Sequence, residues 1–205
     1  MTEFAQAKHN MIQQQIRPWE VLDNRVLNAF EKIDRHLFIP QELQGLAYAD
    51  CQLPVLGKHR MLNPTVEGRM LQALNISSRD LVLEIGCCTG YITACLAQLA
   101  RHVQSVDLDH EAVAATRANL AESGIRNADC KPLDSLAQIT DREKYDAIAV
   151  TAGSMDEIPQ NLLDALSIGG RLFVITGQAP ARQAVLITRA SHNEWTRVSL
   201  FETEL

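Results

Sequence analysis

Residues 81–91 read Leu81-Val82-Leu83-Glu84-Ile85-Gly86-Cys87-Cys88-Thr89-Gly90-Tyr91. The first five form a nearly continuous apolar run, which is typical of a short β-strand covered on both faces. Gly86 and Gly90 follow, and glycine allows a tight turn whose backbone comes close to a ligand. We therefore expect a strand, then a ligand-binding turn, then a helix that begins near Tyr91.

The same alternation of strand and helix continues along the rest of the chain. Further strands are expected at 102–106, 127–131, 145–150 and 171–176, and helices at 91–100, 109–122 and 159–166. Two last strands, 184–188 and 195–200, flank a turn-like segment and predict an antiparallel hairpin. The pattern indicates an α/β fold: a Rossmann-like, doubly wound, mostly parallel sheet closed by an antiparallel C-terminal hairpin.

The first eighty residues have a different character. Asp23 is placed to cap a helix with an apolar stripe, and Asn63-Pro64 has the form of a second helix start. Between them lies a segment rich in turn residues, 53–58. We expect an N-terminal helical subdomain over residues 1–80 and an α/β core over residues 81–205.

Composition narrows the class of protein. The chain has 205 residues, of which 46% are hydrophobic and 21% charged, so one globular domain with a substantial core is expected. The net charge of -6 argues against a broad nucleic-acid-binding face. There is no apolar run of about eighteen residues and no basic, apolar leader. Five cysteines without C-x-x-C spacing indicate reduced thiols. A cytoplasmic protein that binds neither nucleic acid nor membrane is predicted.

An acidic residue completes the candidate site. Asp107 ends the second strand of the α/β part, 23 residues after Glu84, where a carboxylate can accept hydrogen bonds from both hydroxyls of a ribose. A dinucleotide-binding turn would need glycine at positions 88 and 91, and a P-loop would end in Gly-Lys-Ser/Thr. Cys88 and Tyr91 therefore disfavour a dehydrogenase.

Several motifs together resemble one enzyme family. Residues 84–90 resemble motif I of the S-adenosylmethionine-dependent methyltransferases, with Cys88 at its middle glycine. A set of further segments resembles, in the same order, the protein-L-isoaspartate O-methyltransferases over residues 10–178. They are Arg35-His36-Leu37-Phe38-Ile39-Pro40, Ala47-Tyr48-Ala49-Asp50, Leu53-Pro54-Val55-Leu56-Gly57, residues 145–152, Ile158-Pro159 and residues 166–172.

The resemblance implies a cofactor, an acceptor and a set of site residues. The cofactor would be S-adenosyl-L-methionine, and the acceptors would be proteins or peptides bearing isoaspartyl residues, repaired through a succinimide. Asp107 would hold the ribose, residues 86–90 the methionine part, and Asp134 the adenine side. The full set of expected cofactor-binding residues is Glu84, Gly86, Cys88, Thr89, Gly90, Tyr91, Asp107, Leu108, Leu133, Asp134 and Thr151. Glu84 either orders the turn or approaches the cofactor's amino group.

The expected substrate loop departs from the family pattern. Where the family has Q-T-I-S-x-P, this chain has His59-Arg60-Met61-Leu62-Asn63-Pro64, so that Arg60 and Leu62 replace two hydroxyl residues. The segment Leu133-Asp134-Ser135 likewise replaces G-D-G. We take Arg60 and Leu62 as the candidate catalytic residues: the guanidinium of Arg60 either grips the acceptor carboxylate or is a solvated loop side chain. This chain is thus a divergent member with an altered loop.

The chemistry of the transfer explains why few catalytic groups are expected. A carboxylate with an ordinary pKa of about 4 is already ionised at neutral pH, so methylation needs alignment and exclusion of water rather than a general base. No metal is expected. Two alternatives stay open: a methyltransferase of the same fold with a different acceptor, and a catalytically silent, cofactor-binding homologue. The sequence does not indicate an oligomeric state.

Overall fold

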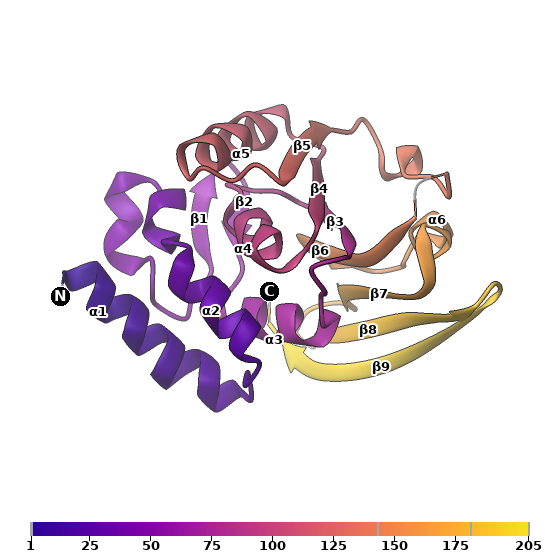
Figure 1. The fold of residues 1–205 in the computed structure, drawn as a ribbon, viewed down its shortest axis with the longest axis horizontal. Helices are drawn as coiled ribbons and strands as arrows, with labels where there is room; N and C mark the ends of the chain where they lie inside the picture. Colours follow the sequence, from indigo (N-terminus) through magenta and orange to yellow (C-terminus); the bar gives the residue numbers. More distant parts are fainter. Residues whose placement is uncertain (1, 143, 181, 205) are drawn as a thin grey trace.

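Within residues 2–142, 144–180 and 182–204, which the computed structural model describes, seven strands form one sheet in the order β5-β4-β3-β6-β7-β8-β9 (Figure 1). Five neighbouring strands are parallel: β5 (Ala128–Pro132), β4 (His102–Asp107), β3 (Leu81–Ile85), β6 (Tyr145–Met155) and β7 (Leu166–Thr176). The last two, β8 (Arg182–Ser191) and β9 (Glu194–Thr203), are antiparallel. The expected mostly parallel sheet with a closing C-terminal hairpin is confirmed.

Helices cover both faces of this sheet. On one face lie α3 (Pro64–Leu74) and α4 (Tyr91–Leu99), together with the N-terminal α2 (Asn24–Lys32). The other face is covered by α6 (Gln160–Asp164) and the 3-10 helix η5 (Leu136–Gln138). Alternate strand residues point into the two cores: Val82 into the first and Leu83 into the second. This is the alternation of a strand covered on both sides.

The remaining elements lie over β4 and β5 or beside α2 and α3 (Figure 1). The helix α5 (His110–Glu122) packs against β4 and β5. The N-terminal segment comprises α1 (Glu3–Asn10), the π-helix η1 (Met11–Ile16), and the 3-10 helices η2 (Arg17–Trp19), η3 (Arg35–Phe38) and η4 (Gln41–Leu46). Every helix in the described residues is too short or too polar to span a bilayer.

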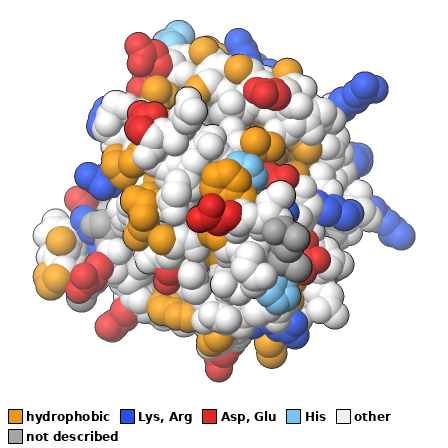
Figure 2. Space-filling view, turned by 90° about the vertical axis from the view of Figure 1, so that its left-hand side faces the viewer, with side chains coloured by type: hydrophobic (Ala, Val, Ile, Leu, Met, Phe, Trp, Pro, Cys, Tyr) orange, Lys and Arg blue, Asp and Glu red, His pale blue; other side chains and the backbone are white. Residues whose placement is uncertain are grey.

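Figure 2 shows acidic, basic and hydrophobic side chains interspersed on one face of the molecule.

Two of the three expected capping residues form capping hydrogen bonds at the start of their helices. The carboxylate of Asp23 accepts a hydrogen bond from the amide of Arg25 at 2.8 Å, and that of Asp109 accepts one from the amide of Glu111 at 2.8 Å. Both side chains satisfy amides that the first helical turn leaves without a partner. Asn63, in contrast, makes no capping bond at the start of α3.

Three boundaries differ from those expected. The turn-rich segment after residue 52 contains a small hairpin, β1 (Leu53–Leu56) and β2 (His59–Met61). The helix expected over 159–166 spans only Gln160–Asp164, because Leu166 already pairs with Tyr145 and starts β7. That strand passes through Gly170, where a Cβ atom would stand 2.9 Å from the carbonyl oxygen of Tyr145. Finally, β6 continues to Met155 with an irregular register.

Arg171 ties the N-terminal segment to the sheet. From β7 its Nε donates to the carbonyl oxygen of Leu74 at 2.9 Å, and its Nη2 donates to that of Asn75 at 2.9 Å and pairs with Asp80 at 2.8 Å. Nη1 donates to the carbonyl oxygen of Asp146 at 3.0 Å. One guanidinium therefore satisfies acceptors at the C-terminal end of α3, in the segment before β3 and in β6.

Replacing Arg171 by leucine is expected to lower the free energy of unfolding by about 2–3 kcal/mol, since several partly buried acceptors lose their donor. Urea unfolding measures the change. Arg79→Leu, at an exposed position with no side-chain hydrogen bond in the described residues, is the matched control. Equal unfolding midpoints for the two variants would show that the Arg171 contacts add nothing.

Candidate functional site

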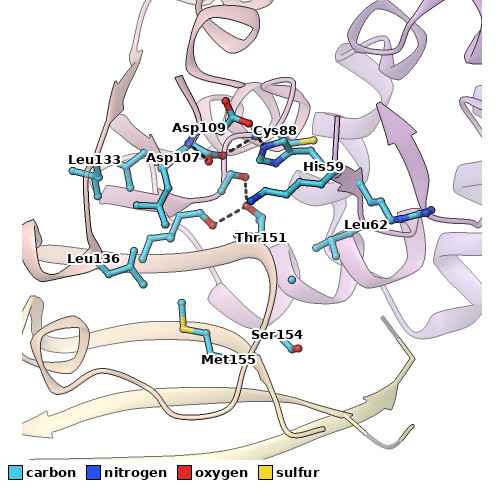
Figure 3. A pocket seen from close by; sticks show the side chains of 18 of the residues that line it. His59, Leu62, Cys88, Asp107, Asp109, Leu133, Leu136, Thr151, Ser154 and Met155 are labelled. Carbon is cyan, nitrogen blue, oxygen red and sulfur yellow. Dashed lines mark hydrogen bonds and ion pairs between the residues drawn. The ribbon is translucent and has the colours of Figure 1, made fainter. Parts of the chain in front are cut away.

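A cavity of about 750 Å³ lies at the carboxyl ends of β3, β4 and β6 (Figure 3), and we call it the edge cavity. The strand order reverses here, between β3 and β6, and parallel α/β sheets bind ligands at this kind of position. Figure 3 shows Asp107, Asp109, His59 and Cys88 grouped together, with Leu133 and Leu136 on one side and Leu62 on the other. The strand ends and the β1–β2 hairpin thus enclose one space.

The turn after β3 comes into direct contact with β6. Gly86 has a φ of +103°, and a Cβ atom there would stand 2.5 Å from the backbone nitrogen of Ala152. Only glycine fits this position. The hydroxyl of Thr151 donates to the carbonyl oxygen of Gly86 at 2.6 Å, and the amide of Gly86 donates to the carbonyl oxygen of Val106 at 2.8 Å. The turn is therefore held from both neighbouring strands.

Cys88 occupies the middle-glycine position of the turn. Its φ is +53°, a left-handed conformation that side chains other than glycine, asparagine and aspartate rarely adopt. It lines the edge cavity, and its amide donates to Oδ2 of Asp107 at 3.4 Å. Burial raises the pKa of the Cys88 thiol to about 12, so the side chain is neutral at pH 7 and is not an activated nucleophile.

Asp107 lies at the end of β4 with its carboxylate held in place. Oδ1 accepts a hydrogen bond from the amide of Asp109 at 3.0 Å, and the Cys87 thiol donates to Oδ2 at 3.6 Å. The residue is 8% exposed and lines the edge cavity. A carboxylate fixed in this way keeps lone pairs available for a vicinal diol.

Glu84 lies behind the turn rather than in the edge cavity. It is fully buried, and its Oε2 accepts hydrogen bonds from the hydroxyls of Thr93 at 2.5 Å and Ser105 at 2.7 Å. The Thr151 hydroxyl stands 3.5 Å from Oε1. Burial raises the pKa of Glu84 to about 7, against the opposing effect of these hydroxyls. The carboxylate therefore connects β3 with α4, β4 and β6.

A polar contact joins the β1–β2 hairpin to the far side of the cavity. Nε2 of His59 lies 2.9 Å from Oδ2 of Asp109, which also caps α5. The hydrogen bond from His59 lowers the pKa of Asp109. In the sequence, Asp109 has only the signature of a helix cap and His59 is only one residue of the substrate loop, because nothing local indicates that these two positions meet.

The edge cavity brings together eight of the residues named from the sequence: Arg60, Leu62, Gly86, Cys88, Asp107, Leu108, Leu133 and Thr151. Glu84, Thr89 and Tyr91 instead line a smaller space of about 20 Å³ beside it, which we call the inner chamber. Gly90 precedes α4 and lines neither space.

Asp134 also lines neither space, although the preceding Leu133 lines the edge cavity. It is exposed, and its Oδ2 accepts a hydrogen bond from the side chain of Gln138 at 3.0 Å. Residues 152–155 and Leu136 line the edge cavity without having been expected there. In the described part of the chain, no three His, Cys, Asp or Glu side chains are grouped so as to hold a metal ion.

Comparison with known proteins places these features in a family. Residues 6–202 match the family model of protein-L-isoaspartate(D-aspartate) O-methyltransferases. A protein-L-isoaspartate O-methyltransferase of Synechococcus sp. is 34% identical over 98% of this chain and 84% of its own length. That of Methanoculleus marisnigri is 38% identical over 89% of this chain and 82% of its own length.

The fold has counterparts among solved structures. A Plasmodium falciparum protein assigned as a protein-L-isoaspartate O-methyltransferase, crystallised in complex with S-adenosyl-L-homocysteine, superposes with a TM-score of 0.80 at 17% identity. The match covers 99% of this chain and 96% of that one. A second protein-L-isoaspartate O-methyltransferase structure gives a TM-score of 0.82 at 22% identity, covering 96% of this chain and 64% of that one.

The buried carboxyl of Glu84 predicts a pH dependence of stability. The unfolded chain ionises this group near its ordinary pKa of 4.5, whereas the folded protein ionises it near 7. Rising pH therefore favours the unfolded chain across this interval, and Glu84 stabilises the fold less at pH 7 than at pH 4.5. In Glu84→Gln, the free energy of unfolding is expected to fall less between these two pH values than in the wild type.

Urea unfolding at the two pH values checks this prediction. Asp134→Asn, an exposed carboxyl at the same edge of the sheet, serves as the control and should leave the wild-type pH dependence in place. A wild-type pH dependence retained in Glu84→Gln would mean that the group titrates at the same pH in both states.

Proposed function

The chain belongs to the protein-L-isoaspartate(D-aspartate) O-methyltransferase family, and from this premise we propose that the edge cavity carries out that family's reaction. The enzyme is an S-adenosyl-L-methionine-dependent methyltransferase whose acceptors are isoaspartyl residues of damaged proteins and peptides. The observation that carries the proposal is the oriented Asp107 carboxylate at the switch point of the sheet, beside a glycine turn pressed against β6.

The residues present fit the cofactor. A volume of about 750 Å³ lies within the range of small-molecule sites. Asp107 would accept hydrogen bonds from the ribose hydroxyls, and the apolar side chains of Leu108, Leu133 and Leu136 would contact the adenine. Gly86 and Cys88 both line the edge cavity, and Gly86 carries no side chain. The backbone of the turn would therefore lie along the methionine part. When bound, S-adenosyl-L-methionine supplies an electrophilic methyl group on a sulfonium.

The acceptor carboxylate needs to be held and kept dry rather than deprotonated. Leu62 is 5% exposed and lines both the edge cavity and the inner chamber. An apolar side chain there excludes water from the space beyond the turn. Arg60 lines the same spaces and is exposed, and its side chain makes no hydrogen bond or ion pair within the described residues. Its guanidinium is available to orient a carboxylate through two parallel hydrogen bonds.

Arg60 and Leu62 also support a second candidate function. Both replace hydroxyl residues of the family's substrate loop, which favours transfer from the same cofactor to a carboxylate other than isoaspartyl. The N-terminal part, residues 1–80, is proposed to act as the cap that carries this loop.

All five cysteines are free thiols, which supports the cytoplasm as the compartment of the enzyme.

Cofactor binding is the first test. Isothermal titration calorimetry with S-adenosyl-L-homocysteine should show binding by the wild type and a roughly ten- to hundredfold weaker affinity in Asp107→Asn, because a charge-assisted hydrogen bond to the ribose is lost. Glu122→Gln, exposed at the C-terminal end of α5 and lining neither space, should bind like the wild type. Failure of the wild type to bind at millimolar concentration would refute the proposed function.

Acceptor identity is the second test. Transfer of a labelled methyl group to an isoaspartyl peptide, with the matching aspartyl peptide as the control, should yield a base-labile ester. Arg60→Ala should raise the KM for the peptide with little change in kcat, since the guanidinium binds the acceptor in the ground and transition states alike. Arg101→Ala, exposed at the opposite edge of the sheet, should change neither constant.

The outcomes separate the alternatives. Cofactor binding with no transfer to the isoaspartyl peptide, but transfer to another carboxylate, would establish the different acceptor. Cofactor binding without turnover on any carboxylate would establish a silent homologue.

A further inference from the structure

The inner chamber opens beside the edge cavity at the turn after β3. The two spaces share Arg60, Leu62, Gly86, Cys88 and Thr151 as lining residues. With about 20 Å³, the inner chamber holds a group of the size of one water molecule or one ammonium ion. It is reached from the side on which the methionine part of the cofactor would lie.

Glu67, on α3, presents an incompletely satisfied carboxylate to this chamber. The side chain is 1% exposed and its Oε2 forms an ion pair with Nη1 of Arg35. Its Oε1 has no hydrogen-bond partner in the described residues. Buried carboxylate oxygens without a donor are costly, so Oε1 is an acceptor prepared for a ligand.

Arg35 bonds the other oxygen of Glu67 and a backbone carbonyl, while its Nε, like Oε1 of Glu67, has no hydrogen-bond partner in the described residues. Its Nη2 donates to the carbonyl oxygen of Leu62 at 2.8 Å, and its guanidinium lies 4.7 Å from the centre of the Tyr91 ring. Burial raises the pKa of Glu67 to about 7, while Arg35 opposes the rise. A second positive charge near Oε1 would hold the carboxylate ionised.

The hydrogen-bonding state of the other polar side chains in the chamber indicates which kind of ligand fits. Glu84 already accepts hydrogen bonds from the hydroxyls of Thr93 and Ser105. Thr89, in the turn, is 5% exposed, and its hydroxyl has no hydrogen-bond partner in the described residues. The hydroxyl of Tyr91, which also lines the chamber, likewise has no hydrogen-bond partner in the described residues. The chamber therefore combines a free carboxylate oxygen with the hydroxyls of Thr89 and Tyr91 and is lined by two acids, a set that suits a small cation with several N–H donors.

We propose that Glu67 binds the α-ammonium group of the cofactor's methionine part, with the Thr89 hydroxyl as a second acceptor. The ammonium group would donate one hydrogen bond to Oε1 of Glu67, a charge-assisted contact in a dry environment. This assigns the role to α3 instead of to Glu84, the acid of the turn motif. The inference rests on the proposed function, because it requires that the edge cavity bind this cofactor.

The test compares two ligands that differ only in the amine. Calorimetry is run with S-adenosyl-L-homocysteine and with the analogue in which hydrogen replaces the α-amino group. The wild type should prefer the amine-bearing ligand by roughly ten- to a hundredfold. In Glu67→Gln, which keeps the shape of the side chain and an acceptor for Arg35, this preference should fall to within about threefold, with the affinity for the analogue nearly unchanged.

Two further variants guard against a general loss of structure. Thr89→Val removes a buried hydroxyl without breaking an ion pair, so it should fold like the wild type and show a smaller preference for the amine, by about three- to tenfold. Asp80→Asn breaks the ion pair with Arg171 at the opposite edge of the sheet and should leave the preference intact. Thr89→Val keeps the test decisive if Glu67→Gln does not fold.

Each remaining outcome overturns the inference. A wild-type preference retained in both Glu67→Gln and Thr89→Val would exclude the inner chamber as the amine site while leaving the proposed function in place. If Glu67→Gln lowered the affinity for both ligands equally, Glu67 would act only by holding Arg35 and, through it, the backbone of Leu62. Loss of the preference in Glu84→Gln alone would return the role to the turn motif. No binding of either ligand to the wild type would refute the proposed function as well.

Discussion

The close approach of Gly86 to Ala152 is the contact on which the whole binding edge depends. A single added Cβ atom would collide with the β6 backbone at Ala152, and the hydroxyl of the neighbouring Thr151 donates to the carbonyl oxygen of Gly86. Because the turn is held there, the amide of Cys88 reaches the Asp107 carboxylate beside the cavity at the carboxyl ends of the strands. Backbone geometry, more than any catalytic side chain, therefore prepares the site, as suits a reaction that requires alignment of an already ionised acceptor.

Four carboxylates surround this turn, and their surroundings give each a different role. Asp107 is oriented by backbone amides and keeps free lone pairs toward the edge cavity. Oε2 of Glu84 accepts hydrogen bonds from the hydroxyls of Thr93 and Ser105, so this carboxylate joins β3 to α4 and β4. Asp109 caps α5 and secures the β1–β2 hairpin through His59. Glu67 has only half of its carboxylate paired, in a chamber of ammonium size. Residue type alone does not distinguish these roles, whereas the partners of each oxygen do.

Sequence reasoning succeeded where a local signal was sufficient. The strand before Gly86 and the caps at Asp23 and Asp109 depend on neighbouring residues, and each was correctly located. It failed where pairing between distant segments set the boundary. Asn63 had the residue type of a cap, but the Asp50 carboxylate accepts the bond from the amide of Thr65 instead, at 3.2 Å. Likewise α6 ends early because Leu166 pairs with Tyr145.

The sequence by itself determined the fold class, the position of the glycine turn and the acid at the end of β4, because each is encoded by residues close together in the chain. Only the tertiary structure decided which of the acids near the turn are satisfied, that His59 meets Asp109, and that Glu67 from α3 lies beside the turn. These contacts join segments separated by many residues, so no local pattern of hydrophobicity or capping specifies them. The burial that distinguishes Glu67 from a surface glutamate exists only once α3 has packed against the sheet.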